Sequence, residues 1–337
     1  MKKFHFPKMD RNSLLFLSAI LLLSIALLPA AAQAAPAAAP PVPKQPSGKT
    51  TDTTPTFVWT GVAGATAYQL QVMQVYTIGV ATSACGASTC SKAPGTVLVP
   101  GPYSWRVRAK VGGVWQAWSA LKSFLVAAGF SEGFNGGSTG WAQFHGTWIY
   151  DAMTVYSEGT AGDYDSFYYS YLKYSTFTYE VKLKRSSGGS TNGLYFRGLR
   201  NDFNPTTFVW SNTFLFLYTN NGDFFIGWLE DGNVKSPTGY VASSAIVPNG
   251  WNRLKVTANG NYMRFYINNT LVADGYFAVF NNGFVGVFMF TDTGRLDIDW
   301  ATLSTSAPAA PDAAADAAGV LHLDESMAVP FELPQGP

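Results

Sequence analysis

The segment RLDIDWATL, residues 295–303, carries two carboxylates that could act together. Asp297 and Asp299 are separated by one residue, and on a β-strand residues i and i+2 lie on the same face. Hydrolysis of a glycosidic bond uses such a pair of carboxyl groups, one as general acid and one as nucleophile or base. In the alternative, both aspartates face solvent or pair with basic neighbours, and Ile298 and Trp300 pack inward. The choice between a catalytic pair and an ion-paired surface depends on the elements that position this strand.

The region from Thr54 to Val126 has the alternating pattern of short β-strands. In AYQLQVMQV, one face carries Tyr68, Leu70 and Val72, and the other carries Gln69, Gln71 and Met73. Period-two alternation with turn residues between the segments indicates an all-β sandwich. A domain of this length, residues 50–127, has the size of an immunoglobulin-like or fibronectin-like module.

A second β-rich region runs from about Phe130 to Leu303. In YSTFTYEVKLKR, one face carries Phe177, Tyr179, Val181 and Leu183, and the other carries Thr178, Glu180, Lys182 and Lys184. Hairpin turns are predicted at Asn221-Gly222, near Asn259-Gly260 and at Asn268-Asn269, since such pairs adopt the primed turns that join paired strands. We expect a large jelly roll over residues 130–304.

The two ends of the chain carry export and tail signals. Four basic residues precede an apolar run of 15 residues and an Ala-Gln-Ala site, which predicts a signal peptide over residues 1–34 rather than a membrane span. The alternative is an uncleaved N-terminal anchor. Composition predicts a Pro/Ala linker over 35–49 and a disordered acidic tail over 305–337. The expected location is secreted, periplasmic or on the cell surface, in a bacterium.

Charge and cysteine content exclude several classes of partner. Loss of residues 1–34 removes four basic residues and one acidic residue, which leaves 18 basic against 20 acidic. This balance argues against a nucleic-acid partner, which needs a concentrated basic face. The cysteines are Cys85 and Cys90. Zinc would need more ligands than they and the few histidines supply, so we predict a disulfide between them.

Both regions resemble known families. The motifs TPTFVWTGVAGATAYQLQV, GPYSWRVRA and WQAWSALKSFLV resemble a bacterial fibronectin type III-like module that is common in secreted proteins and usually serves as a spacer or adhesion unit. The ordered series FSEGFNGGSTGW, FTYEVKLKR, NGLYFRG, GWNRLKV, MRFYINNTLV and LDIDWATL resembles the concanavalin A-like lectin and glucanase sandwiches. It is nearest to laminin-G-like and 3-keto-disaccharide hydrolase-like domains. That family includes lectins, glycosidases and scaffolds.

The resemblance bears directly on the two aspartates. In glucanases of this fold the catalytic strand reads E-x-D-x-x-E or E-x-D-x-E, and its last Glu is the acid/base. Here Asp297 and Asp299 stand for the first two carboxylates, but the acid/base position falls on Ala301 or Thr302, which cannot deliver a proton. We therefore expect no catalytic residue in this strand.

Ligand-binding candidates come from strand parity in NGLYFRG. With Phe196 facing the core, Tyr195 and Arg197 would share the accessible face, where a ring can stack on a sugar and a guanidinium can orient hydroxyls. Trp210 and Trp228 are further candidates near the same sheet. The alternative is that Arg197 pairs with a carboxylate and that each aromatic belongs to the core.

Loop carboxylates raise the question of calcium. Glu158, Asp163 and Asp165 lie close together in sequence, and oxygen ligands of this kind hold calcium in several related domains. Solvated loop charges are the competing interpretation, and no other cofactor is indicated.

The sequence as a whole predicts an exported, monomeric protein with a non-catalytic carbohydrate- or matrix-binding jelly roll on a fibronectin-like spacer. Its partner would be a glycan or an extracellular matrix polysaccharide. One alternative is a carbohydrate-active enzyme of the 3-keto-glycoside hydrolase or glucanase type. The other is a purely structural surface module.

Overall fold

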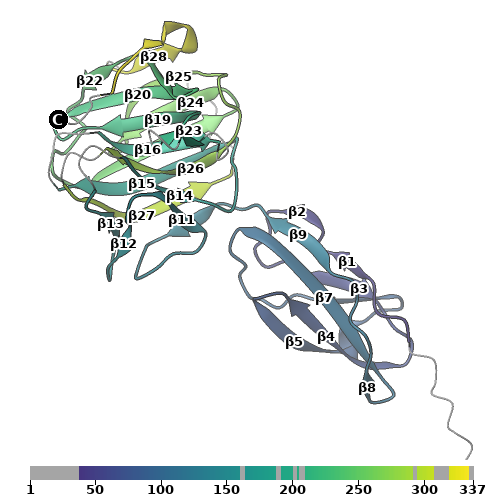
Figure 1. Cartoon of the computed structure of the whole chain (residues 1–337). Coiled ribbons are helices and arrows are strands. Elements are labelled where there is room, and N and C mark those ends of the chain that lie inside the picture. The colour runs from purple at the N-terminus through teal and green to yellow at the C-terminus, as the bar shows by residue number, and fades with distance from the viewer. Residues whose placement is uncertain are drawn as a thin grey trace, which may run out of the picture.

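The structure is a computed structural model that describes residues 38–159, 164–186, 191–199, 203–204, 209–290, 294–306 and 319–333. For residues 203–204 and 209–210 it describes the backbone alone. These residues form two β-sandwiches, which Figure 1 shows end to end. The predicted all-β class and the concanavalin A-like jelly roll are confirmed. No helix in the described part of the chain is long and apolar enough to cross a membrane, and the predicted signal peptide lies outside that part.

The N-terminal sandwich pairs a sheet of order β1-β3-β6 with a sheet of order β2-β9-β7-β4-β5, to which β8 adds. Its core is aromatic, since Trp59 and Trp105 are fully buried between the sheets. Cys85 and Cys90 are joined in a disulfide, as predicted. The fibronectin-like identity of this domain stays a prediction. Its strands are β1 (Pro43–Gln45), β2 (Gly48–Thr50), β3 (Phe57–Thr60), β4 (Ala65–Val72), β5 (Tyr76–Ala81), β6 (Thr89–Lys92), β7 (Gly101–Val111), β8 (Val114–Trp115) and β9 (Lys122–Val126).

The N-terminal sandwich begins earlier in the chain than the composition predicted. Strand β1 and the first two residues of β2 lie inside the expected linker of residues 35–49. The indole Nε1 of Trp105 donates a hydrogen bond to the carbonyl oxygen of Pro46 at 3.0 Å. A buried indole N–H needs an acceptor, so this segment is part of the fold despite its proline content.

One sheet of the jelly roll, here called the β27 sheet, has the order β12-β13-β27-β15-β23-β24-β25-β28, and β10 also pairs with β27. Strand β15 alternates strictly between buried and partly exposed residues, which confirms the predicted faces. The strands are β10 (Phe130–Glu132), β12 (Ile149–Tyr150), β13 (Val155–Ser157), β15 (Phe177–Arg185), β23 (Asn252–Asn259), β24 (Tyr262–Ile267), β25 (Thr270–Tyr276), β27 (Leu296–Ser304) and β28 (Leu321–Asp324).

The facing sheet, here called the β16 sheet, has the order β11-β14-β26-β16-β19-β20-β21-β29, and β22 also pairs with β20. Its strands are β11 (Trp141–His145), β14 (Tyr164–Tyr169), β16 (Asn192–Gly198), β19 (Thr213–Tyr218), β20 (Asp223–Glu230), β21 (Asn233–Ser236), β22 (Tyr240–Ala242), β26 (Phe284–Phe290) and β29 (Val329–Pro330). Strands β17 (Phe203–Asn204) and β18 (Val209–Trp210) form a separate ribbon.

The predicted hairpin turns are present. Asn268 and Asn269 both have positive φ, at 50° and 71°, and Ile267 pairs with Thr270 across them. A two-residue turn with two positive φ angles matches the right-handed twist of the strands that it joins. Gly222 and Gly260 also lie at turns with positive φ, 92° and 58°.

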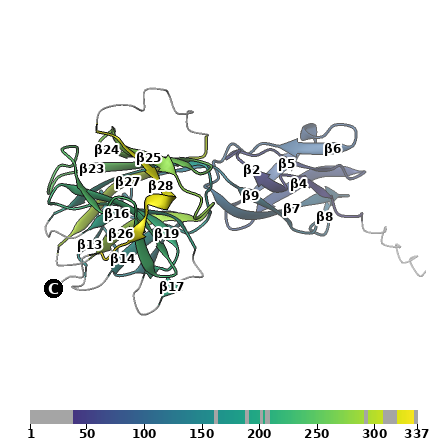
Figure 2. The same ribbon diagram turned by 90° about the horizontal axis from the view of Figure 1, so that it is seen from above.

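The C-terminal segment corrects the prediction of a disordered tail over its described part. β28 pairs in parallel with β25 at the edge of the β27 sheet, and β29 pairs with β21 at the edge of the β16 sheet. The short helical turn Glu325–Met327 connects them. Figure 1 shows this segment in yellow at the top of the jelly roll, and in Figure 2, seen from above, it lies across the middle of that domain. It covers one open edge of each sheet, which is where unpaired backbone groups would otherwise be exposed.

Candidate functional site

The two aspartates of β27 lie on the outer side of the β27 sheet, and basic residues pair with both. The ammonium of Lys182 lies 2.6 Å from Oδ2 of Asp299, and the ammonium of Lys184 lies 4.0 Å from Oδ2 of Asp297. The core side of β27 is formed by residues such as Ile298, which is fully buried. The pairing with basic neighbours, the alternative to catalysis, is therefore what the structure shows.

The prediction that Trp300 packs inward beside Ile298 is wrong. The register between β15 and β27 shifts at this point, so that Leu183 pairs with Ile298 and Lys182 pairs with Trp300. The extra residue, Asp299, is a bulge that turns Trp300 outward. Trp300 is partly exposed, and the next residue of the strand, Ala301, is fully buried instead.

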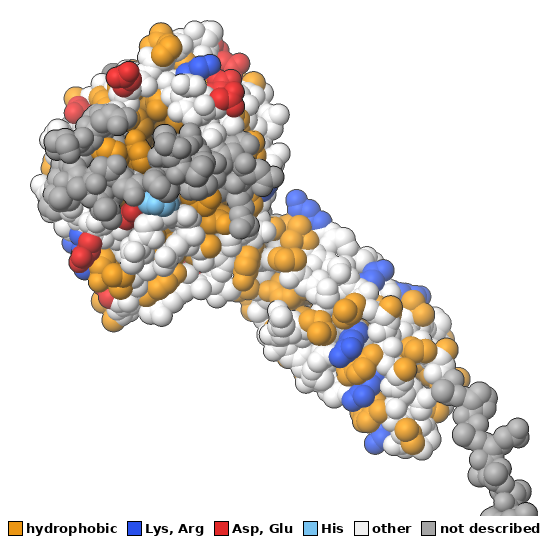
Figure 3. All heavy atoms as spheres, in the orientation of Figure 1, with side chains coloured by type: hydrophobic (Ala, Val, Ile, Leu, Met, Phe, Trp, Pro, Cys, Tyr) orange, Lys and Arg blue, Asp and Glu red, His pale blue; other side chains and the backbone are white. Residues whose placement is uncertain are grey.

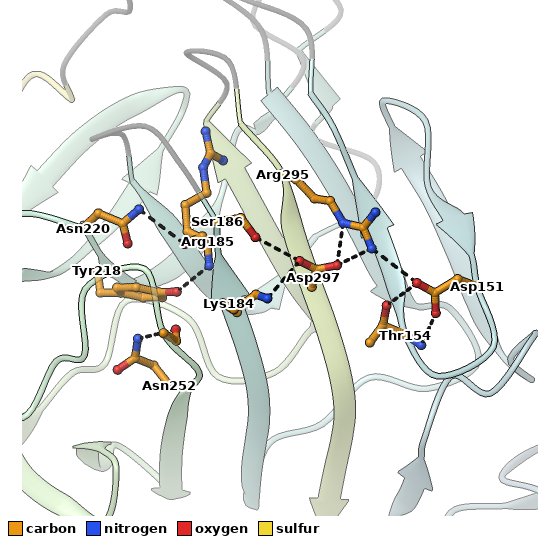
Figure 4. Close-up of polar contacts among 11 residues, drawn as sticks. Asp151, Thr154, Lys184, Arg185, Ser186, Tyr218, Asn220, Asn252, Arg295 and Asp297 are labelled. Atoms are coloured by element: carbon orange, nitrogen blue, oxygen red, sulfur yellow. Dashed lines mark hydrogen bonds and ion pairs between the residues drawn. The ribbon is translucent and has the colours of Figure 1, made fainter.

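Asp297 sits in a larger polar network (Figure 4). Nε and Nη2 of Arg295 each lie 2.6 Å from its Oδ1, and the hydroxyl of Ser186 donates to its Oδ2 at 3.2 Å. Arg295 also reaches Oδ2 of Asp151 at 3.3 Å and lies 3.5 Å above the ring of Tyr156. The carboxylate of Asp297 is 6% exposed, so these contacts compensate a buried charge.

The geometry of this strand does not supply a general acid. A glycosidase needs one carboxyl that can give up a proton and a second one that flanks the scissile bond. Asp297 is held as an acceptor by a guanidinium, and Asp299 is held by an ammonium. Ala301, one of the two positions for an acid, is fully buried. The chemistry available at this strand is charge pairing that joins β27 to β15 and to the β12–β13 hairpin.

The prediction that Arg197 is accessible is wrong. The pairing of β16 with β26 shifts between Phe196 and Gly198, and Arg197 has φ of 54°. This bulge breaks the alternation and directs the side chain into the domain, where it is fully buried. Its Nη1 donates to the carbonyl of Phe280 at 2.7 Å, and its Nη2 donates to two further carbonyls at 2.6 Å each, those of Ser175 and Gly260. Burial lowers the pKa of Arg197 to about 10, so it stays cationic at neutral pH.

The other predicted ligand residues divide between the two faces of the β16 sheet. Phe196 lies in the core between the sheets, and Tyr195 lies on the opposite face, as parity required. Tyr195 is nevertheless only 1% exposed, so the expected accessibility is wrong. Trp228 belongs to the core between the sheets, where it is 3% exposed, so its predicted role as a ligand residue is wrong. Trp210 lies in β18, and its side chain is outside the described part.

The outward side of the β16 sheet carries a second apolar cluster, here called the aromatic face. Glycines leave room for its rings: a Cβ on Gly286 would lie 2.4 Å from the hydroxyl of Tyr195, and a Cβ on Gly227 would lie 2.7 Å from the ring of Phe225. The rings therefore cover the glycine positions of the sheet. The aromatic face consists of Tyr164, Tyr168, Tyr195, Phe225, Tyr240, Phe284, Phe288 and Phe290.

The C-terminal segment covers one side of the aromatic face. Phe331 lies 5.2 Å from the ring of Phe225 and 5.7 Å from the ring of Tyr240, and Leu333 is buried in the same cluster. Its backbone is held where the amide of Phe331 donates to the carbonyl of Val234 at 2.9 Å. The centre of the aromatic face is thereby closed, while Tyr164 and Tyr240 at its margin remain partly exposed.

The margin of the aromatic face combines rings with polar groups. Burial raises the pKa of the Tyr240 phenol to about 12, and the same pKa responds to Thr191, Tyr164 and Asp223. The ring of Tyr164 stacks on Phe288 at 5.2 Å. Aromatic rings beside hydroxyl and carboxylate groups are the elements from which sugar-binding sites are built. We call these four residues, Tyr164, Thr191, Asp223 and Tyr240, the tyrosine margin.

Strand composition could have indicated the aromatic face. FVGVFMF in β26 and TFLFLY in β19 are apolar at nearly every position, and strands that are buried on both faces have this composition. Alternation alone singled out Tyr195 and missed Tyr164 and Tyr240. The contact with Phe331 had no sequence signal, because it depends on a segment whose composition indicates disorder.

The calcium candidates do not form a cation site in the described part of the chain. Asp165 is 1% exposed and accepts a hydrogen bond from the hydroxyl of Ser157, while Glu158 is exposed. Asp163 lies outside the described residues. Among those described, no group of three or more His, Cys, Asp or Glu side chains could hold a metal ion.

Comparison with known proteins relates the jelly roll to carbohydrate chemistry. Residues 129–286 match the 3-keto-alpha-glucoside-1,2-lyase-like domain. No curated protein matches the sequence. Similar solved structures include the carbohydrate-binding module CBM66 from Bacillus subtilis, at 22% identity over 49% of this chain and 96% of that chain, with a TM-score of 0.40. They also include a beta-glucanase from Bacillus licheniformis, at 12% identity over 53% and 99%, with a TM-score of 0.39. The family match makes residues 129–286, less than half of the chain, similar to this domain.

Proposed function

We propose that the protein is an exported carbohydrate-binding protein whose jelly roll holds a glycan at the tyrosine margin without hydrolysing it, and whose N-terminal sandwich acts as a spacer. The observation that carries this proposal is the separation of aromatic residues from paired carboxylates. The rings lie on the outward side of the β16 sheet, whereas Asp297 and Asp299 lie on the outward side of the β27 sheet in ion pairs. Export rests on the N-terminal sequence.

The tyrosine margin offers the two kinds of contact that a sugar needs. The ring of Tyr164, partly exposed at the edge of the sheet, presents an apolar surface for pyranose C–H groups. The carboxylate of Asp223 is partly exposed and can accept hydrogen bonds from sugar hydroxyls. The aromatic core beneath them holds these groups in place, because Tyr164 packs on both Phe288 and Phe290.

A carbohydrate-active enzyme is the second candidate, and the match of residues 129–286 to a 3-keto-alpha-glucoside-1,2-lyase-like domain favours it. The two candidates differ in product formation. A binding protein retains a glycan unchanged, whereas an enzyme releases shorter or oxidised sugars that chromatography detects.

The test is binding of the full chain to an array of plant, bacterial and algal polysaccharides, followed by titration of the best ligand. Tyr164→Leu and Asp223→Asn should each weaken binding by roughly 2- to 10-fold, the effect of one lost ring contact or hydrogen bond of about 0.5–1.5 kcal/mol. Tyr266→Leu is the matched control for Tyr164→Leu, because Tyr266 lies on the outward side of the β27 sheet against Lys255. It should leave affinity unchanged.

Two results would contradict the proposal. One is equal loss of affinity in Tyr164→Leu and Tyr266→Leu, which would place the ligand elsewhere or show a general loss of folding. The other is release of products from a ligand incubated with the native chain. In that case the double variant Asp297→Asn with Asp299→Asn tests whether β27 carries the catalytic residues. An unchanged rate of product release would place those residues outside β27.

A further inference from the structure

The outer side of the N-terminal sandwich carries an alternating series of cations and indole rings on β7, on β8 and on the segment that follows β8. Lys110 lies 5.7 Å from the ring centre of Trp115, and Arg108 lies 5.0 Å from the same ring. Arg108 also lies 4.5 Å from the ring centre of Trp118, which Arg106 approaches at 4.6 Å. All four distances fall within the range of cation–π contacts. We call these five residues the cation–indole ladder.

Local backbone pairing explains why the ladder forms. Arg106, Arg108 and Lys110 are alternate residues of β7, so they share one face at a spacing of ~6.7 Å. Beyond the hairpin of β7 and β8, the chain continues along the same strand, where the amide of Gln116 donates to the carbonyl of Ala109 at 2.9 Å. This path places both indoles among the cations.

Glutamines of the neighbouring strand orient the two guanidinium groups. Arg106 pairs with Gln71 of β4, and its Nε donates to Oε1 of that glutamine at 2.7 Å. Arg108 pairs with Gln69 in the same way at 2.8 Å. A guanidinium has five N–H donors, and one of them is used here. No residue in the described ranges accepts a hydrogen bond from Nη1 or Nη2 of either arginine. The guanidinium groups of Arg106 and Arg108 are therefore fixed in orientation, and their Nη1 and Nη2 donors are unused within the described residues. Each group is called a fork below.

The charge of this domain leaves the forks without an internal partner. Between residues 44 and 128 the chain has seven basic residues and a single acidic one, Asp52. No carboxylate among the described residues forms an ion pair with Arg106, Arg108 or Lys110. Figure 3 shows Lys and Arg side chains alternating with hydrophobic ones along the visible face of this domain, without red carboxylates among them.

We propose that the cation–indole ladder binds a polysaccharide that carries carboxylate groups, such as a polyuronate. Planar guanidinium forks bind carboxylates through two parallel hydrogen bonds, and the repeat of cations along β7 suits a polymer with a repeating charge. Single-stranded nucleic acid fits less well, because its bases stack on free aromatic faces. Each indole of the ladder already contacts two cations. This site lies on a different domain from the tyrosine margin and goes beyond the function proposed for it.

The experiment titrates the full chain with polygalacturonate and with its fully methyl-esterified form, which has the same backbone without charge. The native chain should bind the acid and not the ester. Arg106→Gln with Arg108→Gln should weaken binding at least about tenfold, since hydrogen bonds to charged groups contribute about 1.5–3 kcal/mol, or roughly 10- to 150-fold. Lys44→Gln with Lys92→Gln is the matched control. It removes the same charge from two exposed residues of the opposite sheet and should change affinity less than about threefold by loss of screened attraction alone.

Two further variants separate fork geometry from folding and from diffuse charge. Gln69→Ala with Gln71→Ala leaves the net charge unchanged and should still weaken binding by about 3- to 10-fold, because the forks lose their orienting bonds. Arg106→Lys with Arg108→Lys keeps both charges and should weaken binding similarly, with the melting temperature of each variant as the check on folding. Equal losses in the ladder and control pairs would overturn the proposal, as would equal binding of the ester. Tighter binding of oligothymidylate than of polygalacturonate at matched charge would overturn it as well.

Discussion

Replacement of Arg197 by methionine tests whether this residue is part of the fold or part of a ligand site. Its guanidinium joins three separate backbone carbonyls, those of Ser175, Gly260 and Phe280. Methionine retains much of the volume but donates no hydrogen bond, so three acceptors lose a charged partner inside the domain. A buried acceptor left without its donor costs about 1–3 kcal/mol, and with three such carbonyls we expect a total loss of about 3–5 kcal/mol.

Calorimetry of the full chain provides the measurement. For a domain of the size of the jelly roll, a change of 1 kcal/mol shifts the melting temperature by roughly 2–4 °C, so Arg197→Met should lower that transition by roughly 6–20 °C. The transition of the N-terminal sandwich is an internal control and should not move, because no contact of Arg197 involves that domain. Arg197→Lys, which keeps the charge and loses the fork, should give a smaller shift.

A small effect would refute this reasoning. If Arg197→Met changes the stability of the jelly roll by less than about 1 kcal/mol, the range of ordinary surface substitutions, then the three carbonyls have found other donors and the structural role is wrong. Loss of glycan affinity at unchanged stability would instead restore Arg197 as a ligand residue.

Three further changes have outcomes that urea unfolding can measure. Asp299→Asn should cost at most about 1 kcal/mol because its ion pair is partly exposed, whereas Asp297→Asn should cost about 1–3 kcal/mol because its carboxylate is nearly buried against a guanidinium. A chain that ends at Ser306 should be less stable and should bind the dye ANS, since it lacks the strands that cover the aromatic face. Burial raises the pKa of Tyr218 and of Tyr240 from 10.0 to about 12, so their contribution to stability is complete below pH 10 and is lost as the pH rises toward 12. Urea midpoints that do not change between pH 10 and pH 12 would contradict this contribution of the two tyrosines.

Much of the fold follows from strand periodicity and turn chemistry. The alternation of apolar and polar residues in β15 determines which face of the strand is buried. The paired asparagines at residues 268 and 269 determine a two-residue hairpin turn, because few other residues adopt positive φ readily. The disulfide follows from two cysteines in a chain expected to be exported. These features depend on neighbours in sequence, so local patterns predict them.

The errors about the faces of Trp300 and Arg197 share one physical cause, which is an extra residue in a strand. A bulge at Asp299 turns Trp300 outward, and a bulge at Arg197 turns its side chain inward. Parity arguments assume an unbroken period of two, and one inserted residue exchanges the faces of everything beyond it. Gly198 directly follows Arg197, but no glycine or proline lies next to Asp299, so at β27 only the pairing with the adjacent strand reveals the break.

The C-terminal segment couples the stability of the jelly roll to access at the aromatic face. Phe331 packs against both Phe225 and Tyr240, and Tyr240 belongs to the tyrosine margin. The strand that anchors this contact, β29, has two residues, so it is held by few backbone hydrogen bonds. A glycan at the margin that also needs the surface beneath Phe331 would bind more tightly when this residue is absent, because displacement of the ring no longer opposes binding. Phe331→Ala should therefore lower stability by about 1–3 kcal/mol, as expected for a half-buried ring, and raise glycan affinity at the same time. If both quantities fall together, Phe331 is part of the ligand site rather than its cover.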